Sequence, residues 1–147
     1  MEKTFVMLKP GVLHRRIVGE ILTRFERKGL KIVALKLIQL DEARARSHYA
    51  EHADKAFFYD LATYIVSGPV IACVLEGTDA VAMVRRLIGP TKVQESLPGT
   101  IRGDYAYATQ LNIVHASDSK ASAQRELAIF FNKDEIYEWE DGNAEWF

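Results

Sequence analysis

Residues 112–118 read Asn-Ile-Val-His-Ala-Ser-Asp, and the rest of the chain can be arranged around this stretch. The run predicts a short apolar strand that carries one histidine, His115, into a polar turn. A segment rich in Gly, Pro and Arg, residues 89–104, precedes it, and an amphipathic helical pattern begins near Ser119. His115 thus lies between two kinds of backbone, where side chains are commonly exposed to ligands. A lone histidine is more often a surface or core residue, so its neighbours must decide its role.

The composition is that of an ordinary globular protein. Of the 147 residues 48% are apolar and 27% are charged, which fits one domain over residues 1–147 with a tail at residues 132–147. Nineteen basic and twenty acidic residues give a formal net charge of −1. No global field therefore draws the protein to nucleic acid or anionic lipid, and we expect no dedicated nucleic-acid site. Any site for phosphate has to be local.

Nothing in the sequence predicts a membrane segment or an exported protein. The longest apolar run, residues 70–75, is too short to span a bilayer, and no basic segment followed by a long apolar one opens the chain. The single cysteine, Cys73, lies within that run and cannot form an intrachain disulfide. We therefore expect a cytoplasmic protein without membrane contact, in which Cys73 is a small buried hydrophobe.

Hydrophobic periodicity predicts an alternation of strands and helices in the order β, α, β, α, α, β, α, β, α. We expect strands at residues 4–8, 30–40, 70–75 and 111–114, and helices at residues 17–28, 42–52, 56–65, 80–88 and 120–131. This order suits an α+β fold of the split βαβ plan, with a four-stranded antiparallel sheet covered by helices.

Local signals mark the ends of these elements. Asp41, Thr78 or Asp79, and Ser119 are the expected N-caps of three helices, because their side chains accept hydrogen bonds from free backbone N–H groups. The run Lys9-Pro10-Gly11 predicts a turn after the first strand. Residues 91–108 have no clean period, and a loop of this length in a compact domain is usually functional.

Polar side chains gather at the ends of the expected elements. The common phosphate-loop, metal-ligand and hydrolase motifs are absent from the sequence. Guanidinium and ammonium groups are what a polyphosphate needs, although any one arginine is usually a solvated surface charge. The set consists of Lys9, Arg85, Thr91, Arg102, Asn112 and His115.

Glu126 is the other unusual residue, because it lies at the edge of an apolar helical stripe that contains Ala123 and Phe130. A carboxylate in that place needs a hydrogen-bond or ion-pair partner. It can pair with Ser122 or with a base from another helix, or it can hold one ring nitrogen of a histidine and leave the other free as a nucleophile.

The run at residues 112–118 resembles the active-site signature of the nucleoside diphosphate kinases. Lys9-Pro10, residues 67–70 (Ser-Gly-Pro-Val) and residues 98–104 (Pro-Gly-Thr-Ile-Arg-Gly-Asp) also match that family, in the right order. The likeness covers nearly all of the first 131 residues. It implies a ferredoxin-like fold and a ping-pong reaction, in which a nucleoside triphosphate phosphorylates a histidine and a nucleoside diphosphate then collects the phosphoryl group.

The resemblance implies roles for the residues around the reacting atoms. His115 is the nucleophile, Glu126 and Ser117 orient its ring, and Lys9 and Tyr49 lie beside the transferred phosphoryl group. The protein's contribution to such a reaction is alignment and charge neutralisation, with Mg²⁺ bridging two phosphates of the nucleotide rather than held by protein ligands.

The nucleotide is held, by the same resemblance, through its phosphates, its sugar and its base. Lys9, Arg85, Thr91 and Arg102 contact the phosphates, Asn112 contacts the sugar hydroxyls, and Phe57, Leu61 and Thr109 form the base slot.

Two further expectations concern partners. The family implies a homo-oligomer, a tetramer or hexamer built from dimers, and the tail aromatics, such as Trp139 and Trp146, are expected to pack on a core or on a neighbouring subunit. The alternative to an enzyme is a catalytically silent ferredoxin-like module that binds nucleotides as a sensor or docks proteins through its sheet. A sensor needs the phosphate donors, but it has no need for both His115 and Glu126, so the sequence favours the enzyme.

Overall fold

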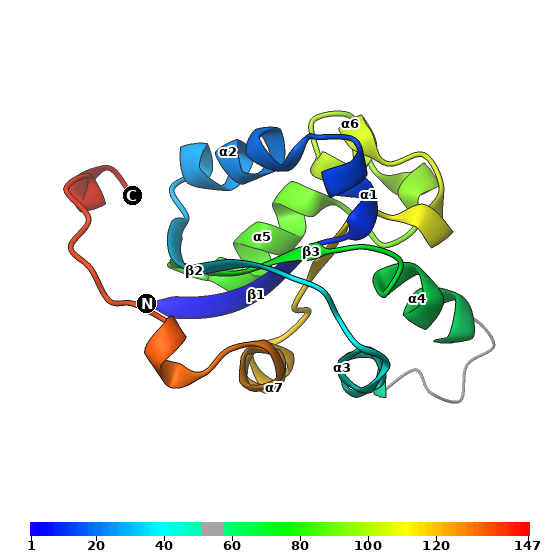
Figure 1. Ribbon diagram of the computed structural model, residues 1–147. Helices are drawn as coiled ribbons and strands as arrows, with labels where there is room; N and C mark the ends of the chain where they lie inside the picture. The colour runs from blue at the N-terminus through cyan, green and yellow to red at the C-terminus, as the bar shows by residue number, and fades with distance from the viewer. Residues whose placement is uncertain (51–57) are drawn as a thin grey trace.

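The computed structural model describes residues 1–50 and 58–147, and its centre is a four-stranded sheet (Figure 1). The strands are β1 (Glu2–Leu8), β2 (Lys31–Ile38), β3 (Val70–Gly77) and β4 (Val114–Ala116). They lie in the order β2-β3-β1-β4, and each neighbouring pair is antiparallel. This confirms the predicted split βαβ sheet.

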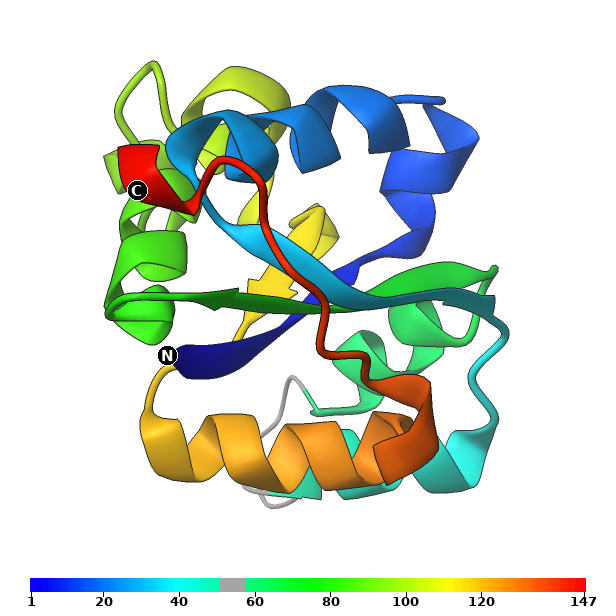
Figure 2. The same ribbon diagram turned by 90° about the vertical axis from the view of Figure 1, so that its left-hand side faces the viewer.

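Helices cover both faces of the sheet (Figure 2). The helices are α1 (Pro10–His14), α2 (Val18–Lys28), α3 (Glu42–His48), α4 (Phe58–Ile65), α5 (Ala80–Ile88), α6 (Ile101–Tyr105) and α7 (Lys120–Phe130). Helices α2 and α5 pack on one face, and α3 and α7 pack on the other.

The alternation of side chains along β1 divides the core into two layers. Val6 and Leu8 face the layer under α2 and α5, whereas Phe5 and Met7 face the layer under α3 and α7. All four side chains are fully buried. By the same alternation Lys9 follows Phe5 and Met7 toward the α7 side.

Two of the predicted helix caps are confirmed. Asp41 accepts a hydrogen bond from the backbone N–H of Arg44 at 2.7 Å, and Ser119 accepts one from that of Ser122 at 3.0 Å. Gly29, which follows the last residue of α2, adopts a left-handed backbone with φ of 105°, a conformation that glycine enters without steric cost.

For α5 the predicted N-cap position is confirmed, but the predicted capping bond is wrong. Asp79 occupies the N-cap position, but its backbone is left-handed, with φ of 50°, and its side chain makes no capping bond. The carboxylate of Glu2 accepts instead from the N–H of Val81 at 3.0 Å. Because Glu2 is distant in sequence, no local pattern identifies it.

The last strand begins three residues later than predicted, at Val114 rather than Leu111. Leu111 ends a short 3-10 turn (Thr109–Leu111), and the Asn112 side-chain oxygen accepts from the N–H of Val114 at 3.0 Å. His115 is therefore inside β4, opposite Met7 of β1, and not in the turn after it.

Other element ends also differ from the prediction. Lys9-Pro10-Gly11 does not form an isolated turn, because Lys9 is the N-cap of α1 and Pro10 is its first residue, a place where proline's missing N–H costs nothing. Helix α3 ends at His48, and the predicted continuation to residue 52 and start of α4 at residue 56 lie outside the described residues. The long loop, residues 91–108, contains one short 3-10 turn (Val93–Glu95) and α6.

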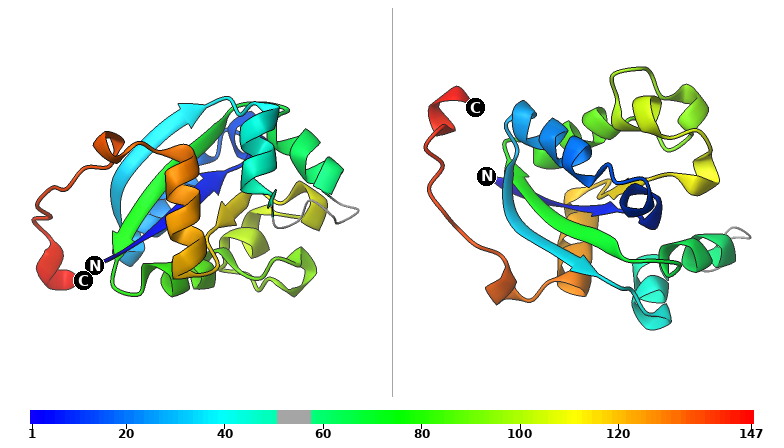
Figure 3. Two further views of the ribbon diagram at one scale, coloured as in Figure 1. Left: turned by 90° about the horizontal axis from the view of Figure 1, so that it is seen from below. Right: turned by 45° about the horizontal axis from the view of Figure 1, so that its top comes forward.

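The tail runs along the outer edge of β2 (Figure 3). The N–H of Tyr137 donates to the carbonyl of Val33 at 2.9 Å, and the indole N–H of Trp139 donates to that of Ile32 at 3.0 Å. Trp139 therefore packs on this chain's own sheet. Within the described ranges no helix is both long and apolar enough to cross a bilayer.

Candidate active site

A cavity of about 570 Å³ opens where β1 and β4 meet α3, α4, α5 and α7. Nearly all of the side chains predicted for the site line it. They are Lys9, Tyr49, Leu61, Arg85, Thr91, Arg102, Thr109, Asn112, His115 and Glu126. Ser117 is fully buried behind the cavity, and Phe57 lies outside the described residues.

Strand parity places His115 in this cavity. Its neighbours Val114 and Ala116 are buried in the layer under α2 and α5. The side chain of His115 consequently points to the opposite face of the sheet, toward α7. Helix α7 buries Ala123, Glu126 and Phe130 along one side, which brings the Glu126 carboxylate to the imidazole.

The imidazole and the carboxylate are in direct contact. Nε2 of His115 lies 2.9 Å from Oε2 of Glu126, and the hydroxyl of Ser117 donates to the same oxygen at 2.9 Å. Because an ionised carboxylate can only accept, Nε2 carries the hydrogen and Nδ1 keeps its lone pair. Of the alternatives for Glu126, the geometry selects the histidine, since Ser122 accepts from Ser119 instead.

The electrostatics of the cavity keep His115 neutral. Burial, followed by the positive charges of Lys9, Arg102 and Arg85, holds the pKa of His115 below its usual value of 6.5. Burial raises the pKa of Glu126, while the hydrogen bond from Ser117 opposes that rise. A neutral imidazole with a free nitrogen is a nucleophile at neutral pH.

Arg102 is not the solvated surface charge that is usual for an arginine. Its side chain is 3% exposed and donates to the backbone carbonyls of Gly89 and Val114, each at 2.9 Å. It thereby ties the end of α5 to β4. Burial, and then the charge of Arg85, lowers the pKa of Arg102 to about 10.

Two more cations complete this corner of the cavity. One is Arg85, which donates to the carbonyl of Ala116 at 3.3 Å. The other is Lys9, whose pKa is lowered to about 8, first by burial and then by the charge of Arg102. Within residues 1–50 and 58–147 neither these two cations nor Arg102 forms an ion pair with a carboxylate. Mutually repelling cations of this kind suit an anion with several charges.

Two of the remaining polar side chains, those of Thr109 and Asn112, form hydrogen bonds within the protein. Thr109 accepts from the N–H of Val93 at 3.1 Å and lies 3.3 Å from the side-chain oxygen of Gln94. The Asn112 oxygen is held by β4, as described above. Tyr49 is 6% exposed, and burial raises the pKa of its hydroxyl.

The sequence reading missed His48, which also lines the cavity. The signal was present, because Ala45, His48 and Tyr49 follow the helical spacing i, i+3, i+4 and all three are buried. Asp118 and Arg125 line the cavity as well and had not been singled out.

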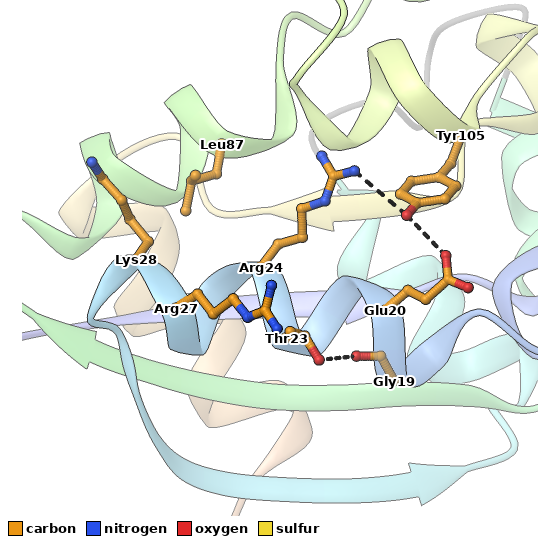
Figure 4. Close-up of a pocket in the computed structure, with 8 residues that line it drawn as sticks. All are labelled: Gly19, Glu20, Thr23, Arg24, Arg27, Lys28, Leu87 and Tyr105. Carbon is orange, nitrogen blue, oxygen red and sulfur yellow. Dashed lines mark hydrogen bonds between the residues drawn. The ribbon is translucent and has the colours of Figure 1, made fainter.

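A second, larger hollow of about 740 Å³ lies on the outer side of α2, next to α6 (Figure 4). Three of its lining side chains have partners: Arg24 lies 2.6 Å from the Asp104 carboxylate, and the Tyr105 hydroxyl donates to Glu20 at 2.9 Å. It contains none of the predicted site residues. The cavity around His115 is therefore the candidate active site.

Known proteins are similar to this chain over nearly its whole length. The family model described as "Nucleoside diphosphate kinase" matches residues 2–136. A nucleoside diphosphate kinase of Treponema pallidum (strain Nichols) is 56% identical over 146 residues, which cover 99% of this chain and 98% of that protein. One from Archaeoglobus fulgidus is 52% identical over 146 residues, covering 99% of this chain and 97% of that protein.

Solved structures are similar in the same way. A halophilic nucleoside diphosphate kinase from Halobacterium salinarum, solved in complex with CDP, has a TM-score of 0.96 and 48% identity, covering 99% of this chain and 97% of that chain. A nucleoside diphosphate kinase family protein from Babesia bovis has a TM-score of 0.95 and 44% identity, covering 99% of both chains. The likeness thus extends over the whole fold.

Proposed function

The chain belongs to the nucleoside diphosphate kinase family of phosphotransferases, and from this premise we propose that it transfers the γ-phosphate of a nucleoside triphosphate to a nucleoside diphosphate through a phosphohistidine at His115. The observation that carries the proposal is the 2.9 Å contact between Nε2 of His115 and Glu126. This contact leaves Nδ1 as the free ring nitrogen.

The first half-reaction starts at Nδ1. Its lone pair attacks the γ-phosphorus, the bond from that phosphorus to the bridging oxygen breaks, and the nucleoside diphosphate leaves with the electron pair. The ring gains positive charge while its proton stays on Nε2, and the Glu126 carboxylate stabilises that charge. In the second half-reaction a β-phosphate oxygen of another diphosphate attacks the phosphohistidine and restores the free imidazole.

The cations align the phosphates for this attack. We assign Arg85 and Thr91 to the β-phosphate, Arg102 to the γ-phosphate, and Lys9 with Tyr49 to the phosphoryl group in transfer. Lys9, Arg85 and Arg102, three of the cations that line the cavity, neutralise the charge that spreads over the phosphoryl oxygens in the transition state. Ser117 acts indirectly, by holding the Glu126 oxygen.

The family implies a divalent metal, and we propose Mg²⁺. A hard dication prefers oxygen ligands, and the carboxylates that line this cavity are Asp118 and Glu126, of which Glu126 already holds His115. The residues therefore fit an ion carried in on the nucleotide phosphates, where it supplies charge neutralisation. Lys9, Arg85 and Arg102 would contact the phosphate oxygens of the nucleotide directly, and the ion would supply further positive charge there.

The base slot we propose consists of Phe57, Leu61 and Thr109, with Asn112 at the sugar. The relative from Halobacterium salinarum was solved with CDP, a pyrimidine diphosphate. Leu61 offers apolar contact to any base, and the Thr109 hydroxyl is engaged by Val93, so it reads no base edge strongly. Broad acceptance of nucleoside diphosphates follows.

We further propose one cytoplasmic domain with a C-terminal tail, assembled into a homo-oligomer built from dimers. Edge strand β2 supports the assembly, because its side chains Leu35 and Leu37 are 48% and 61% exposed. Sedimentation of the purified protein measures the number of subunits. A monomer at micromolar concentration would contradict this part of the proposal.

Incubation with a γ-labelled nucleoside triphosphate tests the enzymatic proposal. We expect a phosphoprotein that is stable in base and labile in acid, that loses its label when any nucleoside diphosphate is added, and that does not form in His115→Gln. Protein that binds nucleotide without taking up label would instead be a silent nucleotide-binding module.

A further inference from the structure

His48 is a buried polar residue with no assigned role. Its side chain is 4% exposed, and neither ring nitrogen has a hydrogen-bond partner among the described residues. The rings of Tyr49, Phe130 and His115 surround it, with centroids 4.6, 5.3 and 4.4 Å away. A buried imidazole without a partner costs free energy, so such a group calls for an explanation. Packing alone would be served better by phenylalanine.

The position of the His48 ring suggests that one of its nitrogens binds a ligand. One nitrogen of His48, one nitrogen of His115 and one carboxylate oxygen of Glu126 all lie within 4.8 Å of one another. The three residues line the same 570 Å³ cavity, through which an ion can enter. Two imidazoles and a carboxylate are a ligand set of zinc sites that keep the fourth position for water.

The distances are close to those that zinc requires. Bonds of about 2.0–2.2 Å to nitrogen and oxygen place tetrahedral ligand atoms roughly 3.3–3.5 Å apart. The Nε2–Oε2 distance of 2.9 Å between His115 and Glu126 has to widen slightly, and His48 has to approach by about an ångström. Small rotations of three side chains supply both changes.

We propose that this chain binds a zinc-type dication between His48, His115 and Glu126, and that the bound ion switches His115 off as a nucleophile. The site itself stands on the geometry of the three side chains. Its inhibitory effect rests on the proposed phosphohistidine reaction.

The switch follows from the proton on the ring. The metal takes the place of the hydrogen between Nε2 of His115 and Glu126, and a neutral imidazole then carries its one hydrogen on Nδ1. No net proton is released. Nδ1 loses its lone pair and cannot attack phosphorus until the metal leaves.

The surrounding charges restrict which ions bind. Lys9 and Arg102 lie close enough to His115 to affect its charge, and they repel any cation, so only an ion that gains strongly from imidazole nitrogen overcomes them. Zn²⁺ and Co²⁺ have that preference, whereas Mg²⁺ favours oxygen. The inhibitory site and the proposed Mg²⁺ carried by the nucleotide are therefore chemically distinct.

Titration of the nucleotide-free protein with Co²⁺ tests the site, because tetrahedral Co²⁺ absorbs visible light and reports its ligands. We expect one site per chain, displaced by Zn²⁺ but not by Mg²⁺. The dissociation constant should rise at least about tenfold in His48→Phe, which keeps an aromatic ring in the aromatic surroundings, since even outer partners of a metal site contribute about 10–100-fold. The matched control is His14→Ala, which removes an exposed histidine and should bind as the wild type does.

Two further readouts complete the test. In the wild-type chain, ¹⁵N spectra of the imidazoles should shift for His48 and His115 on adding Zn²⁺ and stay unchanged for His14, a result that needs no variant to fold. The ratio of labelling with and without Zn²⁺ should approach one in His48→Phe. Absence of Co²⁺ binding in the wild type, or equal binding in His48→Phe, would overturn the proposal. Metal binding by a protein that takes up no label would leave the site standing and refute the kinase reaction instead.

Discussion

The two hollows of the molecule have similar side chains but opposite construction. Both contain arginine, tyrosine and glutamate. In the larger one Arg24 and Asp104 pair with each other while 31% and 27% of their side chains remain exposed. In the smaller one Arg102 and Glu126 are each 3% exposed, and the hydrogen bonds of the Arg102 side chain to described residues go to the backbone carbonyls of Gly89 and Val114.

This difference in burial and pairing distinguishes an ordinary surface hollow from a binding site. Exposed opposite charges neutralise one another and gain little, because water screens them. Buried like charges raise the free energy of the empty protein and are relieved by a ligand of opposite charge. Burial and the lack of a charged partner therefore identify the functional cavity, whereas volume and composition do not.

The largest effect should come from Arg102→Ala. Loss of a cation that stabilises the transition state is expected to lower kcat/KM by about 10²–10³-fold. Two bonds from a charged donor are lost as well, which should lower the free energy of unfolding by roughly 2–4 kcal/mol. Steady-state kinetics and urea unfolding measure the two quantities. The control is Arg86→Ala, an exposed neighbour in α5, for which both should stay near wild type.

Glu126→Gln should come next, with phosphorylation of His115 slowed by about 10²-fold. The amide no longer favours one tautomer of the ring and no longer stabilises its positive charge. Ser117→Ala leaves the carboxylate in place and should cost only about fivefold, the value of one hydrogen bond near 1 kcal/mol. Rapid-quench measurement of label uptake separates the two variants, and equal rates for Glu126→Gln and wild type would refute the pairing.

A pH profile should show a smaller effect that belongs to Lys9. Its pKa is about 8 in the folded protein against 10.5 for an ordinary lysine, so kcat/KM should fall above pH 8, approaching tenfold per pH unit. The nucleotide-free protein should gain stability between pH 8 and 10.5, because the unfolded chain holds a proton that the folded chain has lost. In Lys9→Arg, which stays charged, the fall in kcat/KM should move to higher pH. If the fall stays at the same pH, another group causes it.

The smallest effect is expected in the larger hollow. Arg24→Ala removes an exposed pair and touches nothing near His115, so kcat/KM should stay within about twofold of wild type and the Tm should hardly change. A large loss of activity would mean that the two hollows are coupled and that the contrast between them is false.

Much of the fold could be predicted from local sequence patterns. Hydrophobic periodicity predicted the alternation of strands and helices, and short-range signals predicted the caps at Asp41 and Ser119. The errors have a common cause, since each depends on a residue distant in the sequence or on a competing side chain. Glu2 caps α5 in place of Asp79, and the Asn112 side chain delays the start of β4.

The candidate site could be predicted from the sequence to a similar extent. Resemblance placed His115 and Glu126, and strand parity explains why they meet. The burial of the site side chains could not be predicted from the sequence, because it depends on how α3, α5 and β4 close over the cavity. The sequence identified Arg102 as a candidate phosphate ligand but did not show that it is buried, and it gave no role to His48.

The central claim is that Glu126 holds Nε2 of His115 and thereby selects Nδ1 as the nucleophile. Phosphorus and nitrogen NMR of the ¹⁵N-histidine-labelled protein, after reaction with a nucleoside triphosphate, tests it directly. The phosphoryl group should be bonded to Nδ1 of His115 while Nε2 remains protonated. A phosphoryl group on Nε2, or on any other residue, would contradict the account.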